Sequence, residues 1–320
     1  MNYCIYKLVF TAPLHCGRGD GAVSLTNTAL TLRADTFFSA ICNEAAAQCG
    51  DEVVEELLSL CREGKLLLSD TFPYSDDLLY LPKPFLPLSD HASFDVKNRK
   101  SIKSMEWLPA DEPYMKAYAK YLDSGEMFET KELEKDFAVF RNDVRACVRS
   151  AEEDTKPFDV GCCEFKKNCG LYGIIGYEDK SDANFVLRLL GSIGTGGIGG
   201  LASRGYGRFV LETAADEDKC VKYLKEHLNS SGTYSLLLAT SLPKEEETEK
   251  ALDGAWYNVI RRGGFSYSRY TETVKKQVQY YLSSGSVLKN TFAGDIYVVG
   301  ENQRHKIYRY AKPLFLGVNL

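Results

Sequence analysis

The segment 190–209 has the residue types and spacing best suited to binding a phosphate backbone. It reads LGSIGTGGIGGLASRGYGRF, and eight of its residues are glycines. Glycine tolerates positive φ and lets another backbone approach closely, and exposed amides can donate to phosphate oxygens. Arg204 and Arg208 follow the glycines, and their charges would act on the same phosphates. The alternative is a tight structural turn, which would require fewer glycines.

Gly194, Gly196 and Gly199 also match the dinucleotide-binding fingerprint, which requires a strand before it and a helix after it. Here the order is reversed. Ser181 or Asp182 can cap an upstream helix, and residues 204–212 read as a downstream strand. Because no helix follows the glycines, there is no helix N-terminus at which the phosphates of a nucleotide could bind. The spacing therefore disfavours a nucleotide cofactor.

The order of helix, glycine loop and strand resembles the signature loop of the RAMP superfamily of CRISPR RNA-binding proteins. Leu14-His15-Cys16-Gly17 and the run 34–40 (ADTFFSA) narrow the resemblance to the fourth subunits of type III-A (Csm) effector complexes. RRGGF at 261–265 and YRYAKPLFLG at 308–317 resemble the second half of those subunits. The run 34–40 also predicts a helix that Asp35 can cap.

Arginines and lysines elsewhere extend the candidate surface. Alternation over residues 144–149 places Arg145 and Arg149 on one strand face, at a spacing that matches successive phosphates. The alternative is an exposed arginine pair in surface salt bridges, and the resemblance favours RNA. A lysine and arginine run at 97–103 is either solvated surface or part of the RNA groove. The predicted RNA-binding residues are Gly194, Gly196, Gly197, Gly199, Gly200, Ser203, Arg204, Tyr206, Arg208, His15, Arg18, Arg141, Arg145, Arg149, Lys97, Arg99, Lys100, Arg261 and Arg262.

Length and composition predict a globular protein with two domains. The chain has 320 residues, a formal net charge of −5 and 44% hydrophobic residues. We expect an α+β protein with an N-terminal domain over 1–229, an insertion at about 72–135, and a C-terminal domain over 230–320. The resemblance implies that both domains are ferredoxin-like (RRM-like). The acidic balance means that RNA contacts come from local basic patches.

Composition also predicts where the protein is located and whether it binds a metal. No apolar run is long enough to span a bilayer and no signal peptide is evident, so a cytoplasmic protein is expected. The ten cysteines have no C-x-x-C spacing and are expected to be free thiols. The four histidines are too far apart for a metal motif, and we predict neither a metal nor a cofactor.

The resemblance implies a non-catalytic subunit that holds the 5′ handle of crRNA. It also implies partners: the large Palm-domain subunit and the repeated backbone RAMP subunits, with target RNA nearby. One catalytic alternative is open, a metal-independent endoribonuclease that cuts CRISPR repeat RNA with His15 as general acid or base. Otherwise His15 stabilises its loop or stacks on RNA.

Overall fold

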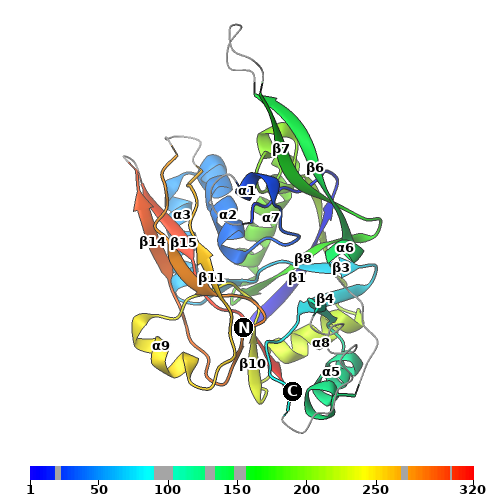
Figure 1. The fold of residues 1–320 in the computed structure, drawn as a ribbon. Helices are drawn as coiled ribbons and strands as arrows, with labels where there is room; N and C mark the ends of the chain where they lie inside the picture. The colour runs from blue at the N-terminus through cyan, green and yellow to red at the C-terminus, as the bar shows by residue number, and fades with distance from the viewer. Residues whose placement is uncertain (19–22, 90–103, 127–133, 148–155, 268–272, 303–304) are drawn as a thin grey trace.

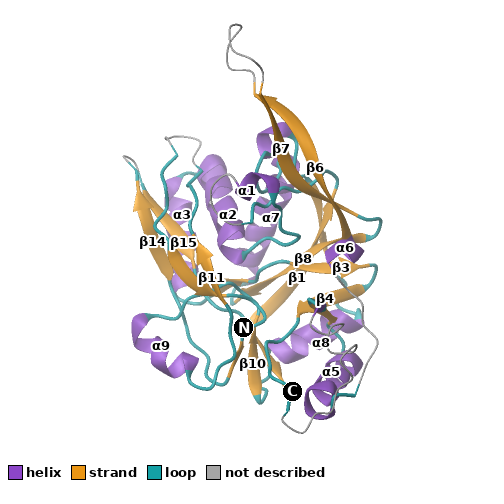
Figure 2. Ribbon diagram, in the orientation of Figure 1, coloured by secondary structure: helices purple, strands orange, loops and turns teal. Residues whose placement is uncertain are grey.

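The computed structural model describes the chain except for residues 19–22, 90–103, 127–133, 148–155, 268–272 and 303–304. The described part is a mixed α/β structure built on antiparallel sheets (Figures 1 and 2). No helix in it is both long enough and apolar enough to cross a membrane.

The largest sheet organises the molecule. It has seven strands, in the order β5-β4-β3-β8-β1-β9 with β2 also paired to β8, and each pairing is antiparallel. Its central strands are near-continuous apolar runs, which suits a strand covered on both faces. The bounds are β1 (Asn2–Phe10), β2 (Leu66–Leu68), β3 (Phe72–Ser75), β4 (Leu78–Pro82), β5 (Trp107–Pro109), β8 (Cys169–Tyr177) and β9 (Phe209–Thr213).

Helices cover both faces of this sheet. Figure 1 shows α2, α3 and α7 on one side and α8 with α5 on the other. The buried face of α2 carries Phe37, Phe38, Ile41 and Ala45 at helical spacing. The helices are α1 (Val23–Thr26), α2 (Ala34–Cys49), α3 (Asp51–Arg62), α5 (Glu112–Ser124), α6 (Glu134–Phe137), α7 (Lys180–Gly196), α8 (Lys219–Leu228) and α9 (Glu245–Leu252).

A long hairpin stands away from the main body. It consists of β6 (Ala138–Cys147) and β7 (Lys156–Phe165), paired in register from Ala138 opposite Phe165 to Cys147 opposite Lys156. Figure 1 shows it projecting past α1 and α7. Its base is joined to the loop after β1, because Leu14 and Cys163 exchange backbone hydrogen bonds of 2.8 and 2.9 Å.

The C-terminal third forms three small sheets. β13-β10-β16 is a three-stranded sheet, and β11–β12 and β14–β15 are two-stranded. The strands are β10 (Tyr234–Leu237), β11 (Val259–Arg262), β12 (Gln279–Leu282), β13 (Val287–Leu288), β14 (Ile296–Glu301), β15 (Lys306–Tyr310) and β16 (Phe315–Val318).

One hydrophobic core extends from the main sheet into the C-terminal third. Tyr310 is fully buried, its ring centroid lies 5.4 Å from that of Phe38, and its hydroxyl accepts from the Leu68 amide at 2.8 Å. Burying side chains of this size contributes about 2 kcal/mol each. A second, smaller core consists of Leu237, Ala251, Leu282, Leu288 and Phe292. Packing therefore couples the two predicted domains, whose boundary remains a prediction.

Several local predictions were wrong. The cap of α7 is Asp179, which accepts from the Ser181 amide at 2.8 Å, and neither Ser181 nor Asp182 is the cap. The strand predicted over 204–212 is β9 and begins only at Phe209, because residues 202–204 form a 3₁₀ turn. Asp35 does not cap α2, because its carboxylate binds an arginine. The predicted insertion at 72–135 supplies β3, β4 and β5 to the main sheet.

Candidate nucleic-acid interface

The glycine loop runs from the end of α7 to β9 and packs tightly on its own protein. A Cβ on Gly197 would lie 2.2 Å from the Tyr206 carbonyl oxygen, and one on Gly207 would lie 1.9 Å from that of Ile198. Both residues also have positive φ, at +91° and +68°. A side chain at either position would collide with backbone. The fold itself therefore requires many of these glycines. Contact with RNA is not needed to explain them.

Other faces of the loop are open. A Cβ on Gly196 meets nothing within 4 Å, and the residue is exposed. Arg204 and Arg208 are exposed, as is Ser203. Within the described residues, neither arginine forms an ion pair. The open side of the loop is therefore formed by Gly196, Ser203, Arg204 and Arg208.

His15 packs against the glycine loop and helps to hold it in place. The residue is 6% exposed, and Nδ1 lies 2.6 Å from the Gly161 carbonyl oxygen on β7. Since a carbonyl only accepts, Nδ1 donates and carries the proton. The His15 carbonyl accepts from the Gly200 amide at 2.9 Å, and a Cβ on Gly200 would lie 2.4 Å from the His15 ring. His15 therefore joins the hairpin to the glycine loop.

A row of charged side chains on β6 faces the loop. Arg141, Asp143 and Arg145 alternate along one strand face, and their carboxylate and guanidinium groups interact. Tyr206 from the glycine loop donates its hydroxyl to Asp143, and Arg145 Nη2 donates to that hydroxyl at 2.6 Å. The Arg145 guanidinium also lies 5.4 Å from the Tyr206 ring centroid, within cation–π range.

These contacts set the protonation state of Asp143. The Tyr206 hydrogen bond is the main cause that holds the pKa of Asp143 below its ordinary value, and Arg141 and Arg145 add to it. Arg141 also binds Glu164 on β7 at 2.6 Å. The guanidinium groups of Arg141 and Arg145 are therefore each held by an acidic side chain of the protein.

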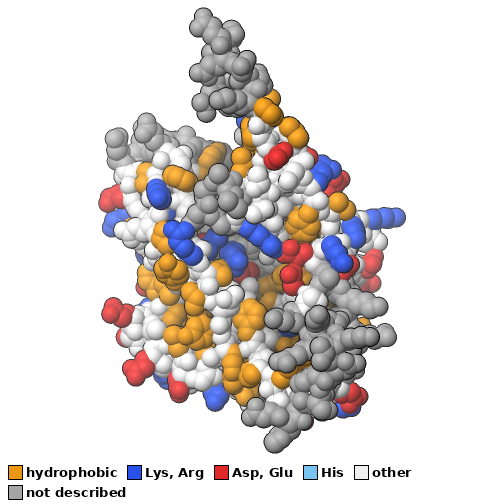
Figure 3. All heavy atoms as spheres, viewed as in Figure 1, with side chains coloured by type: hydrophobic (Ala, Val, Ile, Leu, Met, Phe, Trp, Pro, Cys, Tyr) orange, Lys and Arg blue, Asp and Glu red, His pale blue; other side chains and the backbone are white. Residues whose placement is uncertain are grey.

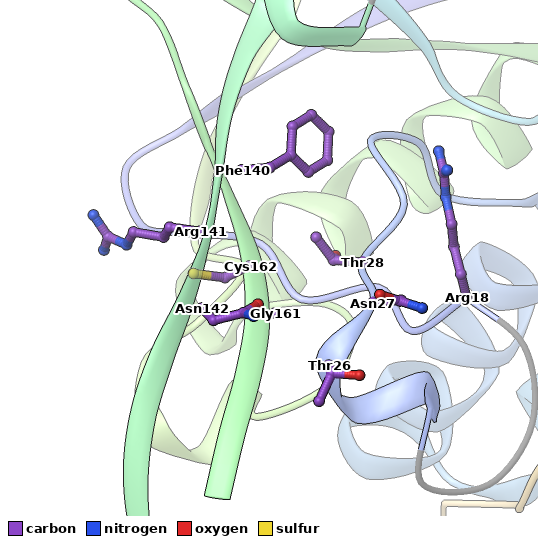
Figure 4. Close-up of a pocket in the computed structure, with 9 residues that line it drawn as sticks. All are labelled: Arg18, Thr26, Asn27, Thr28, Phe140, Arg141, Asn142, Gly161 and Cys162. Carbon is purple, nitrogen blue, oxygen red and sulfur yellow. The ribbon is translucent and has the colours of Figure 1, made fainter.

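A groove of about 580 Å³ lies between the hairpin and the loop after β1 (Figure 4). In Figure 4 Phe140 points toward the groove, and Arg141 points away on the other side of the hairpin. Within the described residues, the side-chain amides of Asn27 and Asn142 have no hydrogen-bond partner. The groove is lined by Arg18, Thr26, Asn27, Thr28, Phe140, Arg141, Asn142, Gly161 and Cys162.

The remaining predicted residues are placed as follows. Arg18 is exposed and binds Glu134 of α6. Arg261 is exposed on β11, and Arg262 binds Asp35 with both carboxylate oxygens engaged. Gly194 is buried, and a Cβ there would lie 2.4 Å from the Phe209 carbonyl oxygen. Lys97, Arg99, Lys100 and Arg149 lie outside the described residues.

The structure thus brings the His15 loop, the glycine loop and the arginine face of β6 to one surface. Figure 3 shows Lys and Arg side chains in a band across the middle of one face of the molecule. The sequence analysis missed the acids that fix the arginines, Asp35 and Asp143. Asp143 could have been found from its alternation with Arg141 and Arg145, whereas Asp35 is 227 residues from its partner and carries no such signal.

Comparison with known proteins agrees with this arrangement. The model of the RAMP superfamily matches residues 7–210, and that of the CRISPR Csm4 C-terminal domain matches residues 230–318. The protein named CRISPR system Cms protein Csm4 of Mycobacterium tuberculosis is 29% identical, over 93% of this chain and 93% of its own length. The protein of that name from Streptococcus thermophilus is 29% identical over the whole of both chains.

Solved structures show the same fold. A chain of the Csm3–Csm4 subcomplex of the type III-A CRISPR–Cas interference complex superposes with a TM-score of 0.64 at 20% identity, over 100% of both chains. A chain of the Csm1–Csm4 cassette in complex with pppApA superposes with a TM-score of 0.62 at 20% identity, over 99% of this chain and 98% of that one. With its signature loop, hairpin and N-terminal match over more than half its length, the chain belongs to the RAMP superfamily.

Proposed function

We propose that the chain is the RNA-binding subunit of a type III-A CRISPR interference complex that holds the 5′ handle of crRNA. It joins the large Palm-domain subunit to the repeated backbone RAMP subunits, close to target RNA, in the cytoplasm. The observation that carries the proposal is the meeting of the glycine loop, the His15 loop and the arginine face of β6. Relatives named Csm4, and solved subcomplexes of Csm4 with Csm1 and with Csm3, support the bridging role.

The fold assignment belongs to this proposal. Strands β9, β1, β8 and β2 or β3 follow the antiparallel order of a ferredoxin-like sheet, and α2 and α7 stand where its two helices would. The family models end at 210 and begin again at 230, which supports domains of 1–229 and 230–320. We propose a ferredoxin-like second domain by analogy with the first.

Binding, without cleavage, is the activity that the site supports. His15 is 6% exposed, its Nδ1 donates to Gly161, and the other edge of its ring packs against Gly200. A general acid or base must come within hydrogen-bond reach of the reacting RNA hydroxyl, which the packing of this ring opposes. Purified protein incubated with repeat RNA should leave the RNA intact, and His15-dependent cleavage would establish the ribonuclease alternative.

The subunit contacts are expected on the exposed apolar surface of the C-terminal third. Tyr280 is 61% exposed and Phe265 is 64% exposed, on and beside the β11–β12 pair. Tyr257 and Val259, just before and at the start of β11, are also exposed. Exposed apolar groups of this size favour protein partners. The chain expressed alone should therefore be less soluble than the chain expressed with its partner subunits.

The decisive experiment is to purify the protein with its partner subunits from cells that express a CRISPR array, and to sequence the 5′ ends of the bound RNA. We expect RNAs that share one 5′ sequence. A matched preparation carrying Arg145→Ala and Arg204→Ala should retain less of this RNA. Bound RNAs with unrelated 5′ ends, or equal retention by the two preparations, would contradict the proposal.

A further inference from the structure

A second group of cations lies where the start of α2 meets the C-terminal third, away from the glycine loop. Three of its members come from β11, from the segment after it and from β15, and the fourth precedes α2. We name it the junction cluster, and it consists of Arg33, Arg262, Lys276 and Arg309 with the carboxylates of Asp35 and Asp70.

Asp35 is already fully engaged. Arg262 Nη2 donates to its two oxygens at 2.7 and 2.8 Å, and Nε donates at 3.0 Å. Arg309 Nε lies 3.9 Å away, and its other nitrogens donate to the carbonyls of Arg262, Gly263 and Gln277. Burial raises the pKa of Asp35, but the charge and hydrogen bonds of Arg262 outweigh it and leave that pKa low.

Asp70 is also satisfied by the protein. It accepts from the amides of Ala34 and Thr240 at 2.8 and 2.9 Å and from the Thr240 hydroxyl at 2.8 Å. Arg33 reaches it only at 3.9 Å, and donates to the Thr240 hydroxyl at 3.0 Å. Neither carboxylate therefore has capacity left for another cation.

Among the described residues, the side chain of Lys276 has no partner. Its backbone amide donates to the Gly264 carbonyl at 2.9 Å, which places it across from the end of β11. Its ammonium makes no hydrogen bond or ion pair within the described residues, although the side chain is only partly exposed. Burial lowers the pKa of Lys276, and the positive charges of Arg309 and Arg262 lower it further while Asp35 opposes them.

The charges of the cluster do not balance. Four cations face two carboxylates, which leaves two positive charges in a partly desolvated position. An unpaired buried charge destabilises a protein strongly, whereas one doubly charged anion or two phosphodiesters would restore neutrality. We propose that the junction cluster binds phosphate, with Lys276 and Arg33 supplying the free donors and Asp35 fixing the orientation of Arg262.

The source of the phosphate, which rests on the proposed function, is the RNA backbone. The cluster continues directly into the His15 loop, since the Ala29 amide, four residues before Arg33, donates to the Cys16 carbonyl at 2.7 Å. An RNA strand that follows this loop can therefore reach the cluster. A carboxylate from a partner subunit is the competing occupant, and the experiment below distinguishes the two.

Lys276→Gln tests the site, with Lys275→Gln as the matched control. Lys275 is the exposed neighbour, and within the described residues its side chain has no ion pair with a cluster member. In the full chain without RNA at low salt, Lys276→Gln should raise the melting temperature, because it removes an unpaired charge. Millimolar inorganic phosphate should stabilise the wild type and the Lys275→Gln protein more than the Lys276→Gln protein.

With handle RNA, Lys276→Gln should lower the slope of log affinity against log salt by about 0.7, the value for one phosphate contact on a single strand. Lys275→Gln should not change it. Identical behaviour of the two variants in all three measurements would overturn the inference. So would weaker capture of the Palm-domain subunit by Lys276→Gln with RNA binding unchanged. If the wild type binds no handle RNA, the proposed function fails, and the phosphate measurement still decides the anion site.

Discussion

The glycine loop and the junction cluster hold their cations in place by different means. In the loop, backbone packing fixes the shape, because a Cβ added at Gly197 would collide with the Tyr206 carbonyl. Arg204 and Arg208 are exposed. In the cluster, ion pairs fix the shape, and Asp35 and Asp70 hold the arginines between two parts of the fold. Substitutions that add bulk should therefore damage the loop, and substitutions that remove a carboxylate should damage the cluster.

The largest effect is expected from Asp35→Asn. Removing the carboxylate leaves the half-buried Arg262 and the buried Arg309 without their anion, and the loss of one partner of a buried pair costs about 3–5 kcal/mol. Urea unfolding should show this loss, and Asp77→Asn, in an exposed turn, should show almost none. An unchanged unfolding free energy for Asp35→Asn would mean that the cluster does not hold the two parts together.

The pH dependence of the same pair of proteins sharpens the test. The folded pKa of Asp35 lies below its ordinary value of 3.8, so its contribution to stability is present above that pH. It is lost as the pH falls from 3.8 toward the folded pKa. The difference in unfolding free energy between wild type and Asp35→Asn should therefore be constant near neutrality and shrink below about pH 4.

The loop should respond to shape. Gly197→Ala introduces a Cβ at φ +91° and 2.2 Å from a carbonyl oxygen, so it should cost about 1–3 kcal/mol or more. Gly196→Ala has open space and a helical position, so it should be neutral or stabilise by up to about 1 kcal/mol. Gly196→Glu should fold and bind handle RNA more weakly than Gly196→Ala. If these two folded variants bind RNA with equal affinity, RNA does not contact the open face of the loop.

The sequence predicted the elements whose signals are local and lost those that depend on distant partners. The run 34–40 predicted the start of α2, and the segment before the glycine loop contains the predicted helix, α7. The role of Asp35 was missed because its partner Arg262 lies in the other half of the chain. The glycines were recognised, but the neighbours that require them, such as the Tyr206 carbonyl and the His15 ring, are defined only by the fold.

A smaller effect is expected where Tyr206 of the loop meets β6, a contact that depends on one hydroxyl. Tyr206→Phe keeps the ring and removes the group that donates to Asp143 and accepts from Arg145. Loss of this hydrogen bond to a charged group should lower the free energy of unfolding by about 1–3 kcal/mol. RNA affinity should fall, and the combination with Arg145→Ala should be no weaker than Arg145→Ala alone. Additive losses in this double-mutant cycle would show that Tyr206 does not act through Arg145.

The smallest effect, and the cleanest separation of binding from folding, is expected from Arg204→Ala. Arg204 is exposed and has no ion-pair partner within the described residues, so its removal should leave the melting temperature unchanged. If it contacts one phosphate, affinity should fall equally for handle RNAs of different sequence, and the salt slope should decrease by about 0.7. Val210→Ala, exposed on β9, is the control and should change neither quantity. A sequence-dependent loss would instead assign Arg204 to a base, and no loss at all would place the RNA elsewhere, leaving the loop with only the packing role that its glycines already have.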